Sequence, residues 1–62
     1  MPKEFQTMLL SDGSMTIAEF IASRPVAHRR FLIAAVSRCL QKRCKLNMAE
    51  IQIAAREIRY AN

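Results

Sequence analysis

The chain has 62 residues, and its ten lysines and arginines against five acidic residues give a formal net charge of +5. This length allows one small domain, and a content of 52% hydrophobic residues is too apolar for a disordered basic tail. So short a chain has little room for an enclosed pocket of about 300 Å³ or more, so we expect a binding protein and not an enzyme.

The sequence indicates neither a membrane span nor a secretion signal. Its longest apolar run covers six residues, 31–36, whereas a bilayer needs about 20. Lys3 and Glu4 begin a segment without the apolar stretch of a signal peptide. Cys39 and Cys44 lie five residues apart on a predicted helix, a poor geometry for a disulfide. We therefore expect free thiols, a cytoplasmic location, and no metal or cofactor.

The first 14 residues are expected to form an extended arm and a turn. Residues 5–10 partly alternate apolar and polar side chains, which predicts a short strand or an apolar arm. The SDGS sequence at residues 11–14 is typical of a turn. A single strand has no pairing partner in a helical chain, so we expect either an apolar arm that packs on a partner or a strand, for which the same strand of a second copy is one pairing solution.

A short first helix is predicted over residues 16–24. Thr16 followed by Glu19 is the pattern of a capping box, in which each side chain bonds to the other residue's backbone N–H. Arg24 precedes Pro25, and a residue before proline is disfavoured in a helix. The helix is therefore expected to end there.

A long second helix is predicted over residues 25–46, because Pro25 suits a first helical position and no later glycine or proline interrupts the range. At about 100° per residue, the helix has an apolar side and a basic side. The apolar side holds Val26, Leu32, Ile33, Val36, Cys39, Leu40 and Cys44. The basic side holds Arg30, Ser37, Arg38, Gln41, Lys42 and Lys45, with Phe31 also on this side.

A third helix is predicted over residues 47–61, where Asn47 and Glu50 repeat the start signal. Its main apolar stripe consists of Met48, Ile51, Ala54, Ala55 and Ile58. A second stripe of Ala49, Ile53 and Tyr60 is predicted to be a homodimer interface.

The predicted fold is all-α and forms a single domain over residues 1–62. It consists of a short first helix, then a long helix and a third helix in an antiparallel hairpin, with an N-terminal extended arm. The short connection between the second and third helices favours the hairpin.

Positive charge is concentrated on the second helix. Seven basic residues and no acid lie between Arg24 and Lys45. A row of such residues on one helix face neutralises several phosphates and releases their counterions. We predict a small basic regulatory protein that binds nucleic acid, DNA included, as a homodimer with no small-molecule substrate. The candidate nucleic-acid-binding residues are Arg29, Arg30, Arg38, Lys42 and Lys45.

Several alternatives remain open from the sequence. Residues 16–36 have the outline of a helix-turn-helix but lack a glycine at the corner. In a ribbon-helix-helix protein, residues 5–10 would be the strand, but this chain is predicted to have one helix more than that fold. The basic face is also compatible with simple solvation, or with a protein-interaction module, an inhibitor or adaptor, that binds an acidic partner without nucleic acid. His28 has no nucleophile or carboxylate at helical spacing, so we expect it at the surface.

Overall fold

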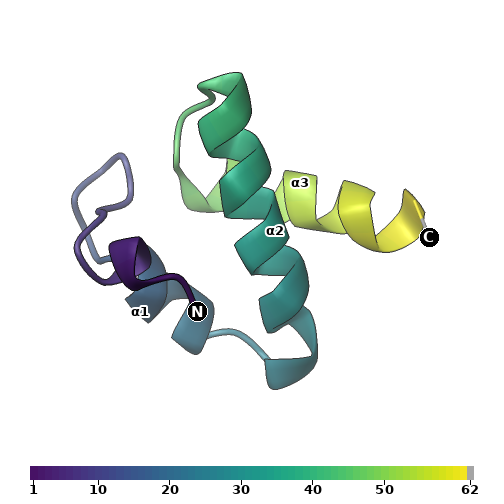
Figure 1. Ribbon diagram of the computed structural model, residues 1–62, viewed down its shortest axis with the longest axis horizontal. Helices are drawn as coiled ribbons and strands as arrows, with labels where there is room; N and C mark the ends of the chain where they lie inside the picture. Colours follow the sequence, from purple (N-terminus) through teal and green to yellow (C-terminus); the bar gives the residue numbers. More distant parts are fainter. Residues whose placement is uncertain (62) are drawn as a thin grey trace.

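The computed structural model describes residues 1–61, so the last residue of the predicted domain lies outside the described residues. The elements are a 3-10 helix η1 (Lys3–Gln6) and the α-helices α1 (Ile17–Ala22), α2 (Val26–Lys42) and α3 (Met48–Ala61). Figure 1 shows α3 crossing α2, with α1 and the N-terminal segment on the opposite side of α2. The all-α class and the helical hairpin of α2 and α3 are confirmed.

Capping hydrogen bonds are present at two of the predicted helix starts, those of α1 and α3. Thr16 Oγ1 accepts the Glu19 N–H at 3.1 Å, and Glu19 Oε1 accepts the Thr16 N–H at 2.9 Å. Asn47 Oδ1 accepts the Glu50 N–H at 2.7 Å. Each bond satisfies a backbone donor that has no partner within its helix. The Thr16 N–H also stabilises the Glu19 carboxylate, which lowers its pKa.

The C-terminus of α2 comes four residues earlier than predicted. Arg43 adopts a left-handed conformation with φ 57° and ψ 35°. The Arg43 N–H donates to the Leu40 carbonyl at 3.3 Å, and the Cys44 N–H donates to the Cys39 carbonyl at 2.9 Å. This pair of bonds is a Schellman motif, which usually has glycine at the left-handed position. With arginine there, the sequence carries no stop signal, and Cys44 is exposed instead of lying on the apolar side.

The N-terminal segment folds onto its own chain. Residues Lys3–Gln6 form η1, and Phe5 and Leu10 are 3% and 2% exposed in the core. Leu9 makes a single antiparallel bridge with Thr16, and residues 1–61 contain no β-strand. This corrects the prediction of a strand or extended arm, because the segment forms η1 and buries Phe5 and Leu10 within the chain itself, although Leu9 stays 54% exposed. The ribbon-helix-helix alternative loses its strand for the same reason.

The core is formed by every helical element. Its buried members are Phe5, Leu10, Ile17, Phe20, Ile21, Leu32, Ala35, Val36, Cys39, Ile51, Ala54 and Ala55. Val26 and Leu40 were predicted on the apolar side but are exposed, since they lie toward the two ends of α2 while α3 crosses its middle. Met48, in the predicted main stripe of α3, is also exposed. Phe31, predicted on the basic side, is half-buried against the core.

Candidate functional site

Two of the three carboxylates of the N-terminal region, those of Asp12 and Glu19, accept backbone hydrogen bonds. Asp12 Oδ1 accepts the Ser14 N–H at 2.9 Å, and the Ser14 hydroxyl and N–H together lower the pKa of Asp12. Glu19 belongs to the capping box. Between residues 1 and 61 one salt bridge forms, from Arg38 Nη1 to Glu57 Oε2 at 4.0 Å. Most of the basic residues therefore have no carboxylate partner.

Arg29 makes a contact within the fold. It is half-buried, and its Nη2 donates to the Ala22 carbonyl at 2.9 Å. This bond satisfies a carbonyl at the C-terminal end of α1 and ties α1 to α2. Arg29 is therefore less available to a ligand than the other four predicted interface residues.

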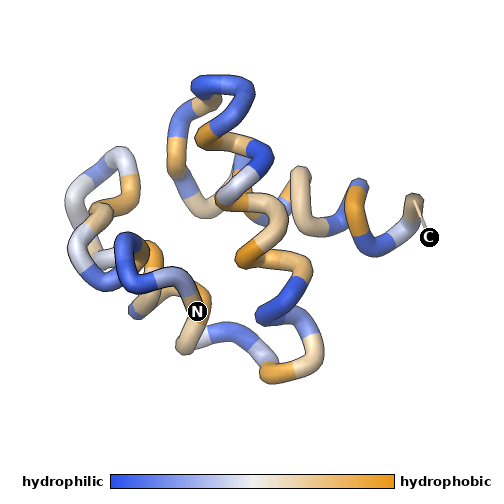
Figure 2. The backbone as a smooth tube through the Cα atoms, viewed as in Figure 1, coloured by the Kyte–Doolittle hydropathy of each residue, from blue (hydrophilic) through white to orange (hydrophobic). Residues whose placement is uncertain are grey.

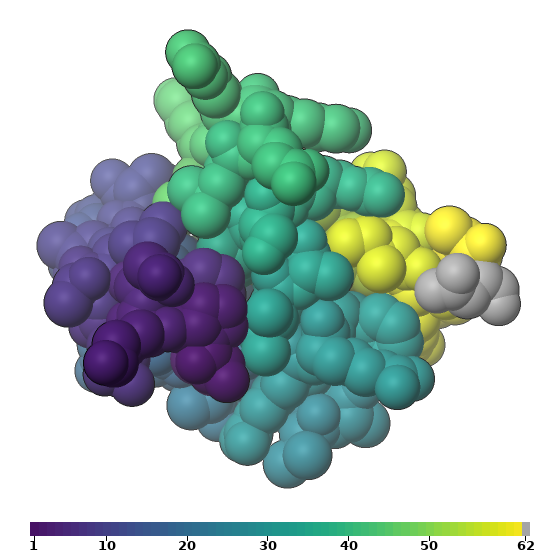
Figure 3. All heavy atoms as spheres, viewed as in Figure 1, coloured from purple at the N-terminus to yellow at the C-terminus, as the bar shows by residue number. Residues whose placement is uncertain are grey.

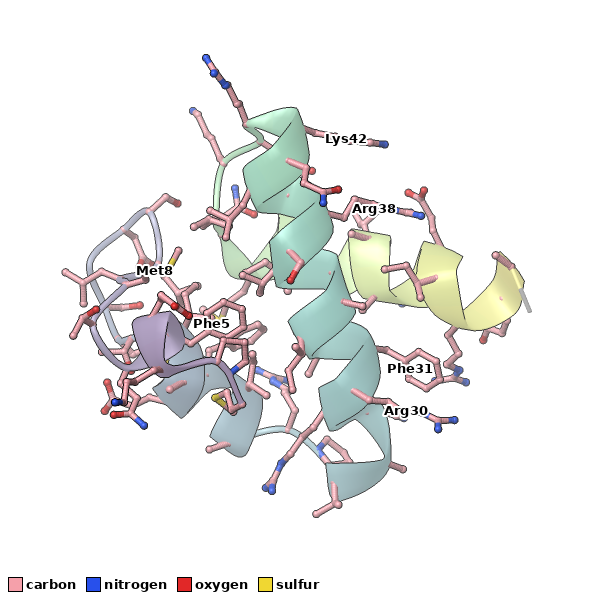
Figure 4. All side chains as sticks on the ribbon, in the orientation of Figure 1. Phe5, Met8, Arg30, Phe31, Arg38 and Lys42 are labelled. Atoms are coloured by element: carbon pink, nitrogen blue, oxygen red, sulfur yellow. The ribbon has the colours of Figure 1, made fainter. Side chains whose placement is uncertain are left out.

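Arg30, Arg38 and Lys42 extend from α2 on the side toward which α3 runs (Figure 4). The Arg30 guanidinium lies over the Phe31 ring, 4.9 Å from its centroid. Arg38 is the partner of Glu57, and Lys42 is exposed. The structure thus brings three of the predicted residues to one side of the molecule.

Three exposed basic residues gather where α2 ends: Lys42, Arg43 and Lys45, here called the basic tip. Figure 2 shows this turn mostly in hydrophilic colours, and Figure 3 shows its side chains projecting from the body. The Ser11 N–H donates to the Leu46 carbonyl at 2.8 Å, which anchors the turn to the N-terminal loop. The sequence prediction missed Arg43, because a helix continued to residue 46 places it on neither defined face.

Because α3 crosses α2, a concavity lies on each side of α3. The larger one, here called the arginine cleft, has a volume of about 360 Å³ beside the N-terminal half of α2. Its polar lining includes Arg24, His28, Arg56 and Arg59, its apolar lining includes Phe31, Leu32 and Ala55, and no acidic residue lines it. The cleft is open to the surface, because the crossing of the two helices creates it between them, and it differs from the enclosed pocket that so short a chain is expected to lack.

The smaller concavity has a volume of about 100 Å³ and carries mixed charge. Arg38 and Lys42 line it together with Glu50 and Glu57. Both acids of α3 thus face the basic side chains in the C-terminal half of α2. The arginine cleft has no such neutralisation.

Side chains from both helices meet inside the arginine cleft. Arg59 Nη1 lies 3.3 Å from His28 Nε2, and Arg59 Nη2 donates to the Tyr60 hydroxyl at 3.4 Å. The Arg24 guanidinium lies over the Phe20 ring at 5.1 Å, and its buried Nε has no hydrogen-bond partner within residues 1–61. Arg56 is exposed. Sequence reasoning missed this cluster, because Arg24 and Arg59 come together only through the crossing of the helices.

The predicted dimer stripe lies on the free surface of α3. Ala49 is exposed, and Ile53 and Tyr60 are 52% and 69% exposed. Their association with a second copy stays a prediction. Cys39 is buried and Cys44 exposed, both as free thiols, and burial raises the pKa of Cys39.

No helix among residues 1–61 is long and apolar enough to cross a membrane. The same part of the chain contains no group of three or more His, Cys, Asp or Glu side chains placed to hold a metal ion. No family model matches the sequence, and comparisons with curated proteins and with solved structures give no match either.

Proposed function

We propose that this chain is a small basic regulatory protein that binds nucleic acid phosphates through α2 and the basic tip. The observation that carries the proposal is that Arg30, Lys42, Arg43 and Lys45 are exposed and none of them forms a salt bridge within the described chain. A 17-residue helix is about 25 Å long, and about 15 phosphates of a duplex lie along such a length.

Arg38 completes the proposed set of phosphate contacts. Its ion pair with Glu57 is long at 4.0 Å, and both side chains reach solvent. Exposed ion pairs of this kind contribute little to stability and are screened by salt. A phosphate can therefore replace Glu57 as the partner of Arg38 at small cost.

The conformation of Arg43 adds support. A left-handed non-glycine residue costs roughly 1 kcal/mol relative to glycine, and glycine is the usual residue at this position of a Schellman motif. The arginine gives the tip a third cation at the expense of backbone strain. Contacts to phosphates carry no sequence information, so the proposed binding is similar for unrelated duplexes.

Further features belong to the same proposal. The chain acts by binding and not by catalysis, in the cytoplasm, where Cys39 and Cys44 stay reduced. It forms a homodimer through the stripe of Ala49, Ile53 and Tyr60. A charged residue in place of Ile53 is expected to give a monomer in analytical ultracentrifugation.

A protein-interaction module that binds an acidic partner is the second candidate function. It is favoured by large apolar side chains that lie mostly in solvent, namely Val26 at 74%, Ile53 at 52% and Tyr60 at 69% exposure. Such side chains anchor protein interfaces, while basic residues at the rim accelerate association.

Fluorescence anisotropy with labelled duplexes of unrelated sequence, at about 50 to 100 mM salt where phosphate contacts are still strong, tests the proposal. We expect similar dissociation constants for all duplexes and weak competition by a poly-glutamate peptide. Absence of binding to any duplex, or equally strong competition by poly-glutamate, would instead favour the acidic-partner function.

A further inference from the structure

We infer that the arginine cleft binds a phosphate monoester attached to a planar or sugar-like group, as in a nucleotide. This goes beyond the proposed function, because the cleft is separate from the basic tip and is built from other residues.

The charge of the cleft sets the chemistry of its ligand. Arg24, Arg56 and Arg59 line it, and neither acid of α3 does, since Glu50 and Glu57 line the opposite concavity. A phosphate monoester carries a charge of about −1.5 to −2 at neutral pH. Guanidinium groups bind phosphate oxygens through two parallel N–H bonds, which makes several arginines around one concavity a suitable phosphate site.

A further observation places positive potential at the cleft. Pro25 lines it as the N-cap of α2, a helix end with no side-chain cap and no acid in its first turn. The positive end of the α2 dipole therefore remains uncompensated there.

The size and floor of the cleft favour an organic phosphate. A volume of about 360 Å³ lies within the usual range for small-molecule sites, and inorganic phosphate fills only a small part of it. Phe31, Leu32 and Ala55 supply apolar surface beside the arginines. The Phe31 ring extends from α2 on the side toward which α3 runs (Figure 4), with one face under Arg30, and it offers a stacking surface for a base.

Two sources provide this chemistry: a free mononucleotide, or the terminal phosphate of a nucleic acid strand. The strand-end form rests on the proposed function, whereas the free-nucleotide form does not. Two measurements on the full chain separate them. Titration of the ¹⁵N-labelled protein with adenosine monophosphate, adenosine or inorganic phosphate reports on the free ligand. Anisotropy with 5′-phosphorylated and 5′-hydroxyl double-stranded oligonucleotides of one sequence reports on the strand end.

The test variants are Arg56→Gln alone and Arg56→Gln with Arg59→Gln, since both side chains are exposed and outside the core. Lys42→Gln with Arg43→Gln is the matched control, because it also removes two positive charges, but from the basic tip instead of the cleft. We expect adenosine monophosphate to bind at least tenfold more tightly than adenosine or inorganic phosphate, as charge-assisted and apolar contacts add. The cleft variants should lose this binding, and the tip variant should keep it.

A 5′-phosphate preference that disappears in the cleft variants assigns the site to strand ends. Equal binding of both oligonucleotides, with nucleotide binding retained, assigns it to a free nucleotide. If neither oligonucleotide binds while adenosine monophosphate does, the proposed function is wrong, but the inference that the cleft binds a nucleotide is supported. The inference is overturned if neither phosphate probe is preferred over its dephosphorylated counterpart, or if the cleft variants bind as well as the unaltered chain.

Discussion

Residues 1–23 and residues 24–61 use their polar groups in opposite ways. The first segment carries one basic and three acidic residues, and the second carries nine basic and two acidic residues. In the first segment, Asp12 and Glu19 accept hydrogen bonds from nearby backbone N–H groups. In the second, Arg38 forms the one salt bridge seen within the described residues. The N-terminal region thus uses two of its three acidic groups to fix its own conformation, while the hairpin leaves most of its cations open to a ligand.

The same contrast recurs on a smaller scale across α3. One side of this helix has Glu50 and Glu57 against Arg38 and Lys42, and the other side has three arginines without an acid. Seven of the nine basic residues of residues 24–61 lie between Arg24 and Lys45, but in space the charge without a nearby acid lies mainly in the arginine cleft and at Arg43 and Lys45 of the basic tip. A ligand for the hairpin is therefore expected to be anionic.

The largest effect is expected from Phe5→Ala, which tests whether the N-terminal region is part of the core. Truncation of a buried phenylalanine costs about 3–5 kcal/mol, a large share of the stability of a small domain. The matched control in the hairpin is Val26→Ala, where the side chain is 74% exposed and the change should stay within about 0.5 kcal/mol. Urea unfolding followed by circular dichroism measures both, and equal stability of the two variants would show that the segment does not contribute to the core.

A smaller loss of stability is expected when the helix cap of each region is removed, Thr16 in the N-terminal region and Asn47 in the hairpin. Thr16→Ala and Asn47→Ala should each lower the free energy of unfolding by about 1 kcal/mol, with Thr16 at the lower end. Ser37→Ala is the control, because this exposed hydroxyl only donates to the Ile33 carbonyl within α2. If the cap variants and the control melt at the same temperature, these bonds do not set the helix starts.

Substitutions at Arg43 and Gly13, which both adopt a left-handed conformation, are expected to change the stability in opposite directions. Arg43→Gly should raise the free energy of unfolding by about 0.5–1 kcal/mol, because glycine adopts φ 57° without strain. Gly13→Ala in the N-terminal loop, at φ 72°, should lower it by roughly 1 kcal/mol even though a Cβ meets no atom within 4 Å. Thermal melts of both variants check the pair, and changes of the same sign would contradict this explanation of the α2 terminus.

The smallest expected effect is a pH dependence in the N-terminal region. The capping bonds lower the pKa of Glu19 below its ordinary value of 4.5 in the folded chain. Its stabilising contribution is therefore complete above pH 4.5 and is lost as the pH falls through the lower folded value. Glu19→Gln keeps a capping side chain but cannot titrate, so its urea midpoint should change less between pH 6 and pH 3. An equal change of the urea midpoint in both proteins would show that Glu19 does not contribute to the loss of stability at low pH.

Local interactions explain what could be predicted from the sequence. The Thr16 and Asn47 caps join residues three positions apart, so their spacing alone indicates them. Periodicity also identified Ile51, Ala54 and Ala55 as the buried side of the third helix. The class of the fold and its hairpin follow from these signals.

The remaining features depend on contacts that spacing does not encode. The α2 terminus rests on a left-handed arginine, for which no sequence signal exists. The N-terminal segment has strand-like composition, but burial of Phe5 and Leu10 in the core determines its conformation. The arginine cleft requires the crossing of α2 and α3, which brings Arg24 to the same concavity as Arg59.

The most direct test of the central claim is the salt dependence of duplex binding, because it counts phosphate contacts. With Arg30, Arg38, Lys42, Arg43 and Lys45 in contact, the logarithm of the binding constant should fall against the logarithm of salt with a slope near −4.5. Lys42→Gln with Arg43→Gln should reduce the magnitude of that slope by about 1.8, whereas Lys3→Gln in the N-terminal region should leave it unchanged. A flat dependence, or an equal reduction for Lys3→Gln, would contradict the assignment of the binding surface to the hairpin.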